Sequence, residues 1–328
     1  MPLRVRTIDF TDARLGTMDR AARDIGEAFR EVGFCYLTGH GIPQSLVEAA
    51  QREARSVFAT WRQRRYGVAP DSESGGEAVS AAVGSNADDE GLAIAFELPA
   101  NDPAQIAALP FLSTQHWRGS GAGFRPAFSR LFDEMGECAE RLLEAVALSL
   151  HAEQTFFKPY YRRRIQRNQA VFQPRARSRP SQHPRDVGPH VDPGCITLRW
   201  QDEGAGTEVL TRGGEWLEAP PLPGTMLVNV GALLSRWSND RLVANLHRVK
   251  NKSDRESLSL LTFYDPSFDA IIDPADLRRD IHEPVNYRPI GTGEFLMKRL
   301  NDRRSIPVHR RHLGVRAEES RNKPETPR

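Results

Sequence analysis

The chain of 328 residues lacks the marks of several protein classes. Its net charge is only +2, from 45 Lys and Arg against 43 Asp and Glu, whereas a dedicated nucleic-acid-binding protein carries a strong basic excess. The sequence has no apolar run near the roughly 18 residues that a membrane-spanning helix needs. No apolar stretch follows the first six residues, as it would in a secretory signal. We therefore predict no nucleic-acid partner, no membrane segment and no export.

Cysteine is also scarce. The three cysteines, Cys35, Cys138 and Cys195, lie far apart and are odd in number, so they do not suit a disulfide framework. This pattern predicts a reducing compartment, the cytoplasm. Hydrophobic residues make up 39% of the chain and charged residues 27%, which is the composition of a globular protein with a buried core. These features leave the oligomeric state open.

The first part of the chain alternates predicted strands and helices. Residues 6–10 alternate polar and apolar side chains, as a half-buried strand does. Residues 17–32 carry one apolar helical stripe, which Gly33 closes at a C-terminal cap. A short buried strand at 34–37 follows, and a long amphipathic helix is predicted from about 129 to 150.

The hydrophobic pattern of the sequence changes between about Gln169 and Asp269. Short apolar runs are separated there by Gly, Pro, Asn and Asp, at the intervals of an all-β sandwich or barrel. The candidate strands are 170–172, 196–200, 208–210, 226–229 and 258–264.

Three residues in this β-rich part carry metal-ligand chemistry. In an extended segment, His190 and Asp192 point to the same side, because successive side chains alternate. A second histidine, His247, follows at the start of another predicted strand. Two histidines and one carboxylate on one side of a metal leave its other side open, as in non-haem Fe(II) oxygenases. A His-x-Asp pair is a weak signal alone, and most of the nine histidines are expected to be surface or capping groups.

Other motifs surround these three residues and run in order from about Thr7 to Leu300. They are Val32–Ile42, His190–Gly194, Pro223–Gly231, Phe263–Pro266 and Gly293–Leu296. Together they resemble the isopenicillin-N-synthase-like branch of the Fe(II)/2-oxoglutarate-dependent oxygenases. The agreement of several independent motifs makes this resemblance specific.

The resemblance implies a mainly β fold with packed helices, in which a double-stranded β-helix, or jelly-roll, is joined to an α/β N-terminal region. Residues 1–125 would form that N-terminal region, 126–300 the jelly-roll core with its long supporting helix, and 301–328 a basic, flexible tail.

The resemblance also implies a chemistry. Iron would be held by His190, Asp192 and His247, with 2-oxoglutarate as cosubstrate and O₂ as oxidant. Turnover would oxidise a small organic molecule and release succinate and CO₂. Hydroxylation, desaturation and ring formation all stay open, because the ligand set does not distinguish them.

One position departs from the family pattern. The family binds the far carboxylate of 2-oxoglutarate with an Arg-x-Ser pair, which the register of Phe263–Pro266 places at Ser257 and Ser259. Serine offers no charge, whereas a guanidinium matches carboxylate geometry. A β-bulge could bring in Arg255, or Arg199 could supply the charge from the strand after the metal motif. An arginine inside an apolar run is costly to bury unless it meets an anion, although Arg199 could also point into solvent.

Two other functions stay open, and the departure at Ser257 motivates the first of them. The first is a non-haem iron oxidase of the same fold that does not use 2-oxoglutarate. The second is a catalytically silent binding protein, which the presence of all three predicted ligands argues against. The substrate cannot be read from the sequence, because pocket specificity would lie in loops such as Ala69–Gly91 and Arg175–Arg185.

Overall fold

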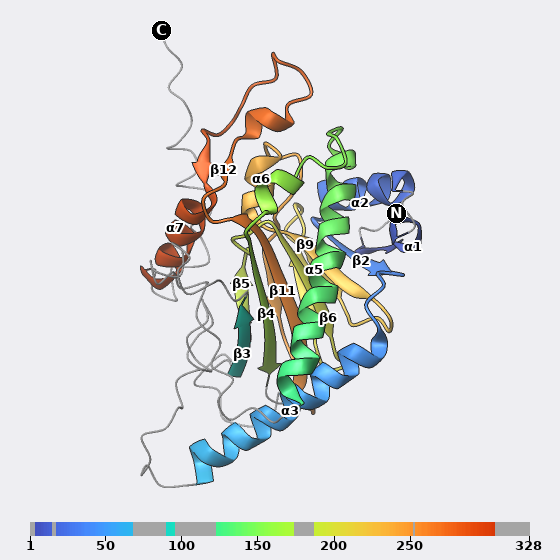
Figure 1. Cartoon of the computed structure of the whole chain (residues 1–328), viewed down its shortest axis with the longest axis vertical. Coiled ribbons are helices and arrows are strands. Elements are labelled where there is room, and N and C mark those ends of the chain that lie inside the picture. The colour runs from blue at the N-terminus through green and yellow to red at the C-terminus, as the bar shows by residue number, and fades with distance from the viewer. Residues whose placement is uncertain are drawn as a thin grey trace.

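A computed structural model describes residues 4–14, 18–67, 90–95, 123–173, 187–251 and 253–305 (Figure 1). The predicted loop at Arg175–Arg185 lies outside these residues, as do most of the predicted loop at Ala69–Gly91 and residues 306–328 of the predicted tail. Residues 301–305 of that tail are the end of a helix. Within the described part, no helix is long and apolar enough to cross a membrane.

Two β-sheets build the centre of the molecule. The larger sheet has seven strands, of which only the β1–β2 pair is parallel. In spatial order they are β1 (Arg6–Asp9), β2 (Phe34–Thr38), β9 (Met226–Val230), β6 (Ile196–Gln201), β11 (Ser257–Ser267), β4 (Arg164–Gln173) and β3 (Glu90–Ala95). The four strands of the smaller, antiparallel sheet are β5 (Val187–His190), β10 (His247–Val249), β7 (Thr207–Leu210) and β8 (Trp216–Ala219).

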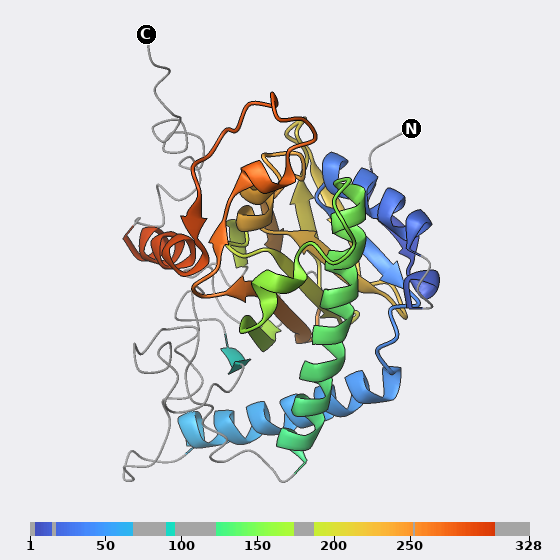
Figure 2. The same cartoon turned by 45° about the horizontal axis from the view of Figure 1, so that its top comes forward.

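Helices cover one side of the larger sheet. The long α5 runs along the strands and contacts both α2 and α3 (Figures 1 and 2). The helices are α1 (Thr11–Arg14), α2 (Asp19–Glu31), α3 (Gln44–Gly67), α5 (Phe124–Ser149), α6 (Ala232–Trp237) and α7 (Thr292–Ser305). Two 3₁₀ segments, η2 (Lys158–Tyr161) and η3 (Pro274–Leu277), and the short pair β12 (Ile271–Ile272) and β13 (Ile290–Gly291) complete the fold. The predicted helices and strands are thus confirmed, with α5 starting five residues before its predicted beginning.

Gly33 ends α2 as predicted. Its φ is +74°, a left-handed conformation that glycine adopts without the penalty of a side chain. A Cβ at this position would lie 1.9 Å from the carbonyl oxygen of Val243. The chain therefore passes directly from α2 into β2, with the Val243 segment packed against the turn.

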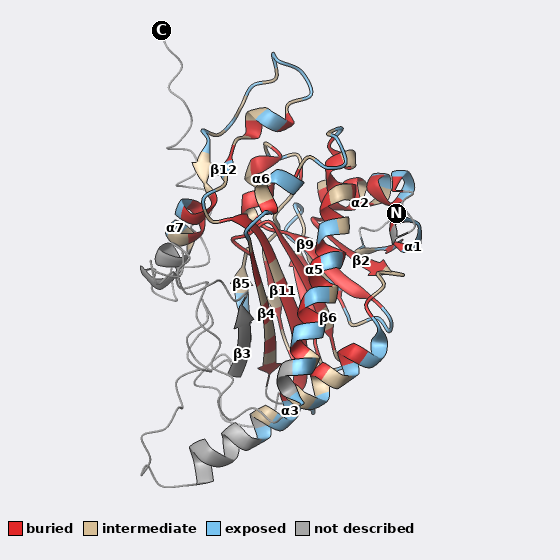
Figure 3. Cartoon of the chain, viewed as in Figure 1, coloured by how far each residue is buried: buried red, intermediate tan, exposed pale blue. Residues whose placement is uncertain are grey.

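The two faces of β11 have different neighbours. Thr262 donates a hydrogen bond to Asn168 at 2.9 Å and lies 3.0 Å from the sulfur of Met135 on α5, so this face packs against the helix. Leu258 and Leu260 lie on the same face and are buried, as are most residues of the central strands (Figure 3). Full burial of each such leucine contributes about 1.5–3 kcal/mol. The alternate residues of β11 face the space between the two sheets.

The predicted N-terminal region and the predicted core share the larger sheet. Strands β1 and β2 form one of its edges and β3 forms the other, while the strands between them come from later in the chain. The division of the chain at residue 125 into an N-terminal region and a jelly-roll core stays a prediction.

Candidate metal centre

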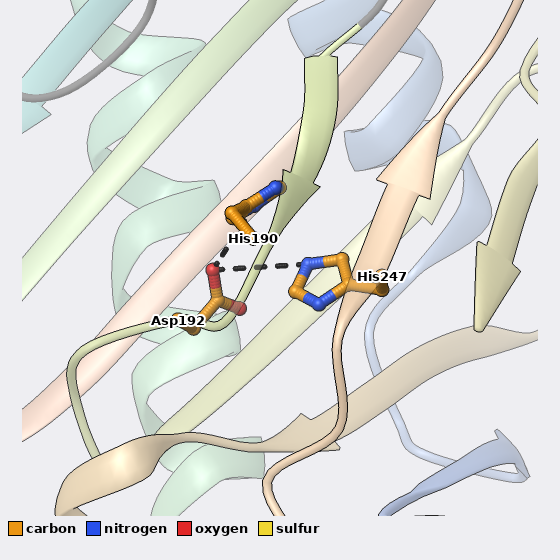
Figure 4. A group of neighbouring side chains, drawn as sticks. All are labelled: His190, Asp192 and His247. Carbon is orange, nitrogen blue, oxygen red and sulfur yellow. Dashed lines mark ion pairs between the residues drawn. The ribbon is translucent and has the colours of Figure 1, made fainter. Parts of the chain in front are cut away.

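The three predicted ligands meet between the two sheets. His190 is the last residue of β5, Asp192 follows it, and His247 opens β10, which pairs with β5 so that the two histidines are directly opposite. Their ring centroids are 4.2 Å apart. One ligand atom from each residue can be chosen so that all three lie within 4.8 Å of one another (Figure 4). A single ion can therefore contact all three.

The two carboxylate oxygens of Asp192 have different partners. Oδ2 accepts hydrogen bonds from the hydroxyl of Thr197 at 2.7 Å and the amide of Asn229 at 2.8 Å. Oδ1 lies 3.6 Å from Nε2 of His190 and 3.8 Å from Nε2 of His247. One oxygen is thus anchored to the larger sheet, and the other faces the two imidazoles.

Both imidazoles present Nε2 to this space. Nδ1 of His190 lies 2.9 Å from the carbonyl oxygen of Gly188, and Nδ1 of His247 lies 3.3 Å from that of Asn245. A carbonyl only accepts, so we assign the ring hydrogen to Nδ1, which leaves the Nε2 lone pair for a metal. Among the described residues, Nε2 of His247 is buried without a hydrogen-bond partner. A ligating role explains this atom.

The electrostatics agree with a metal site. Burial, together with the neighbouring His190, lowers the pKa of His247 to about 3, so its imidazole is neutral. Burial opposes the ionisation of Asp192, whereas the hydrogen bond from the Asn229 amide favours it, and the pKa of that carboxyl lies well below its usual range. Neutral imidazoles and an ionised carboxylate are the forms that bind metals.

The backbone around Asp192 is fixed by α6. The amides at the start of this helix donate to the turn that follows Asp192: Ala232 N–H to the Asp192 carbonyl at 2.8 Å, and Gly231 N–H to the Cys195 carbonyl at 2.7 Å. A Cβ on Gly231 would come within 2.1 Å of the Gly194 carbonyl oxygen. The turn is therefore packed backbone against backbone.

Asp265 supports the same turn from β11. Its Oδ1 accepts a hydrogen bond from the backbone N–H of Cys195 at 2.6 Å, and the residue is fully buried. A Cβ on Gly194 would lie 2.0 Å from this oxygen. Sequence reasoning used Asp265 only to set the strand register and missed this contact. The available signal was a charged residue in a strand, Ser257–Ser267, whose other residues are all uncharged.

The strand that bears His247 is held by the end of α2. The side-chain amide of Asn245 donates to the carbonyl of Val32 at 2.7 Å. The ring of Phe34 packs edge-on against His247, with centroids 5.2 Å apart. The motif at Val32–Ile42 thus contributes to the site by positioning a ligand.

Arg199 points into the interior between the sheets. It lies two residues after Thr197 on β6, hence on the same face, and pairs with Leu261 of β11 and Leu227 of β9. Its exposed fraction is only 7%. Burial lowers the pKa of Arg199, and the charge of Asp192 opposes this shift.

The other predicted cosubstrate residues lie in different places. Ser259 is buried on the interior face of β11, two residues from Leu261. Ser257 is also buried and donates a hydrogen bond to Gln173 at 3.2 Å. Arg255 is exposed in the turn before β11. The pairing of β11 with β4 is regular from Ser257 to Asp265, so no bulge brings Arg255 inward.

Comparison with known proteins identifies the family. A sequence model of the 2OG-Fe(II) oxygenase superfamily matches residues 165–266, and one described as the N-terminal part of non-haem dioxygenases in morphine synthesis matches residues 5–117. A 2-oxoglutarate–Fe(II) type oxidoreductase of Emericella nidulans is 30% identical over 75% of this chain and 74% of its own. The chain belongs to the 2OG-Fe(II) oxygenase superfamily. This oxygenase depends on Fe(II), 2-oxoglutarate and O₂, and it oxidises a small organic molecule with release of succinate and CO₂.

Other relatives agree with this oxygenase in sequence and fold. A homoarginine-6-hydroxylase of Oryza sativa subsp. japonica is 27% identical over 84% of this chain and 87% of its own. The crystal structure of a 2OG-Fe(II) oxygenase family protein from Caulobacter crescentus superposes with a TM-score of 0.75 at 25% identity, over 91% of this chain and 98% of that one. Neurospora crassa T7H in complex with alpha-KG gives 0.74 at 22% identity, covering 90% and 95%. The predicted jelly-roll is confirmed.

Proposed function

We propose that His190, Asp192 and His247 hold the Fe(II) of this oxygenase. The observation that carries the proposal is the convergence of Asp192 Oδ1 with two Nε2 atoms, one of them the buried, unpartnered Nε2 of His247. Two imidazoles and one carboxylate form a donor set that suits Fe(II). Three protein ligands would leave other coordination positions of the metal for O₂ and a chelating 2-oxo acid.

The residues around the ligands determine how the site works. Bound Fe(II) supplies the redox chemistry that couples 2-oxoglutarate oxidation to oxidation of the substrate. Thr197 and Asn229 hold Asp192 in one orientation through Oδ2. The burial of Asp192 and His247 keeps water away from the reacting groups. Of the three outcomes that the sequence leaves open, hydroxylation is favoured, because the rice relative is a hydroxylase.

The proposal can be tested without an identified substrate, by measuring the turnover of 2-oxoglutarate alone. The Fe(II)-loaded protein is incubated with 2-oxoglutarate, and O₂ consumption and succinate release are measured together. His190→Ala, Asp192→Ala and His247→Ala are expected to abolish both signals, with far-UV circular dichroism unchanged. His282→Ala removes an exposed histidine and is expected to leave both signals intact. Full succinate release by the Asp192→Ala protein would contradict the proposal.

The alternative of an iron oxidase that does not use 2-oxoglutarate is not favoured, because the Emericella nidulans relative is itself a 2-oxoglutarate–Fe(II) type oxidoreductase. The departure at Ser257 that motivated this alternative needs a different explanation.

We also propose that the protein works in the cytoplasm. Cys35, Cys138 and Cys195 are all buried thiols without a disulfide, which supports a reducing compartment. A fluorescent fusion that located to an oxidising compartment would contradict this proposal.

A further inference from the structure

We infer that Arg199, on β6, binds the far carboxylate of 2-oxoglutarate, in place of an arginine on β11. This inference rests on the proposed iron centre, since 2-oxoglutarate reaches Arg199 only when its 2-oxo acid end is held by the metal.

Strand register places Arg199 between the metal and Ser259. Thr197 marks the level of the metal centre, because its hydroxyl bonds to Asp192. Arg199 lies one interior position further along β6, opposite Leu261, and Ser259 lies one interior position further along β11. Arg199 and Ser259 are diagonal neighbours, about 7–8 Å apart at Cα. An extended dicarboxylate that leaves the metal along this face meets Arg199 and Ser259 in turn.

The charge of Arg199 is not matched within the described part of the chain. Its guanidinium makes no hydrogen bond or ion pair there, and its paired neighbours, Leu227 and Leu261, are apolar. The nearby carboxylate of Asp192 is already engaged, because Oδ2 accepts two hydrogen bonds and Oδ1 faces the imidazoles. A buried charge without a partner is costly. A carboxylate brought by a ligand would offset that cost through a bidentate pair.

The corresponding position on β11 is closed. Ser257 is 1% exposed and donates its hydroxyl hydrogen to Gln173. Gly204 packs against it so closely that a Cβ on this glycine would lie 3.0 Å from Cβ of Ser257. Ser257 is thus enclosed by Gln173 on one side and by the Gly204 turn on the other. The structure therefore has a neutral, hydrogen-bonded side chain at position 257 of β11 and a buried charged side chain, Arg199, on the neighbouring strand.

Ser259 completes the predicted subsite. Its hydroxyl lies on the interior face, whereas the packing of β11 against the helices uses Leu258, Leu260 and Thr262 on the opposite face. A hydroxyl donates one hydrogen bond to a carboxylate oxygen. Arg199 supplies the charge and Ser259 a neutral donor.

The experiment compares two chelators that differ in the far carboxylate. Dissociation constants of 2-oxoglutarate and of 2-oxobutyrate, which lacks that group, are measured by anaerobic titration of the Mn(II)-loaded protein. Arg199→Met is expected to weaken 2-oxoglutarate binding on the order of 10²-fold, because one partner of a buried charge pair is lost. Binding of 2-oxobutyrate is expected to change less than about threefold, since the metal end is untouched. Arg199→Lys should restore part of the loss.

Matched variants keep the outcomes separate. Arg212→Met removes an exposed arginine from the turn between β7 and β8 and is expected to change neither constant. Equal weakening of both chelators by Arg199→Met would mean a structural role and would overturn the inference. The inference would also be overturned if Arg255→Met lost affinity for 2-oxoglutarate and Arg199→Met did not. If the unsubstituted protein binds neither chelator, the proposed iron centre itself fails.

Discussion

Thr197 donates its hydroxyl hydrogen to Oδ2 of Asp192 at 2.7 Å. The strand β6, which follows Asp192 in the chain, thus orients the carboxylate that is predicted to bind the metal. Asn229 adds a second donor from β9. Groups that orient a metal ligand in this way are worth about 10- to 100-fold in metal affinity.

Thr197→Val and Asn229→Leu are therefore each expected to weaken Fe(II) binding by about 10- to 100-fold. Both changes keep the approximate volume of the side chain and remove the donor. Fe(II) affinity is measured anaerobically with a competing chelator. If both variants bind Fe(II) as tightly as the unsubstituted protein, then Oδ2 needs no anchoring and the assigned geometry of Asp192 is wrong.

Asp265 provides a second prediction, through its acceptance of the Cys195 N–H. Asp265→Ala removes the acceptor and leaves a buried N–H unpaired, which costs about 1–3 kcal/mol. We expect a lower melting temperature and a weaker Fe(II) affinity. Asp265→Asn keeps an oxygen in place and should preserve the affinity. An Asn variant as weak as the Ala variant would show that charge, not the hydrogen bond, is what matters.

The stability of the metal-free protein should depend on pH through Asp265. Burial raises the pKa of this carboxyl from 3.8 to about 6, against the opposing charge of Arg167, while Asp192 adds to the shift. The protonated form is favoured in the fold, so its stabilisation is complete below about pH 4 and is lost as the pH rises through 6. The difference amounts to about 3 kcal/mol.

Urea unfolding of the metal-free protein and of Asp265→Asn at several pH values between 4 and 7 measures this effect. The unsubstituted protein should lose about 3 kcal/mol relative to the Asn variant across that range. Parallel pH profiles would mean that Asp265 does not titrate there.

Gly231 gives a steric prediction. Gly231→Ala places a Cβ 2.1 Å from the Gly194 carbonyl oxygen, and relieving that overlap typically costs about 1–3 kcal/mol. Because the displaced turn carries Asp192, we expect both the melting temperature and the Fe(II) affinity to fall. Gly213→Ala, whose Cβ would meet only Thr211 Oγ1 at 3.6 Å, serves as the control and should change neither.

Local patterns were enough to predict much of the fold. The apolar stripe before Gly33 and the short apolar runs after Gln169 depend on neighbouring residues, and the structure confirms the helices and strands they predicted. The convergence of His190 and Asp192 follows from strand alternation. The approach of His247 needed the family resemblance, because the 54 residues between Asp192 and His247 carry no local signal for pairing.

Long-range packing accounts for what was missed or left open. The sequence could not predict which face of the sheet Arg199 lies on, because both faces of its strand are buried. The pairing of Arg199 with Leu261 shows that it lies on the face between the two sheets. The support that Asp265 gives to Cys195 joins residues 70 positions apart. The close approach of Gly204 to Ser257 joins residues more than fifty positions apart, so no local pattern indicates it.

Anaerobic titration with Fe(II) and 2-oxoglutarate measures directly whether His190, Asp192 and His247 hold the iron, because a ferrous 2-oxo acid chelate gives a visible charge-transfer band. The band is expected to grow to one equivalent of iron in the unsubstituted protein and to be absent from His190→Ala, Asp192→Ala and His247→Ala. A band of full strength in any of these three variants would contradict it.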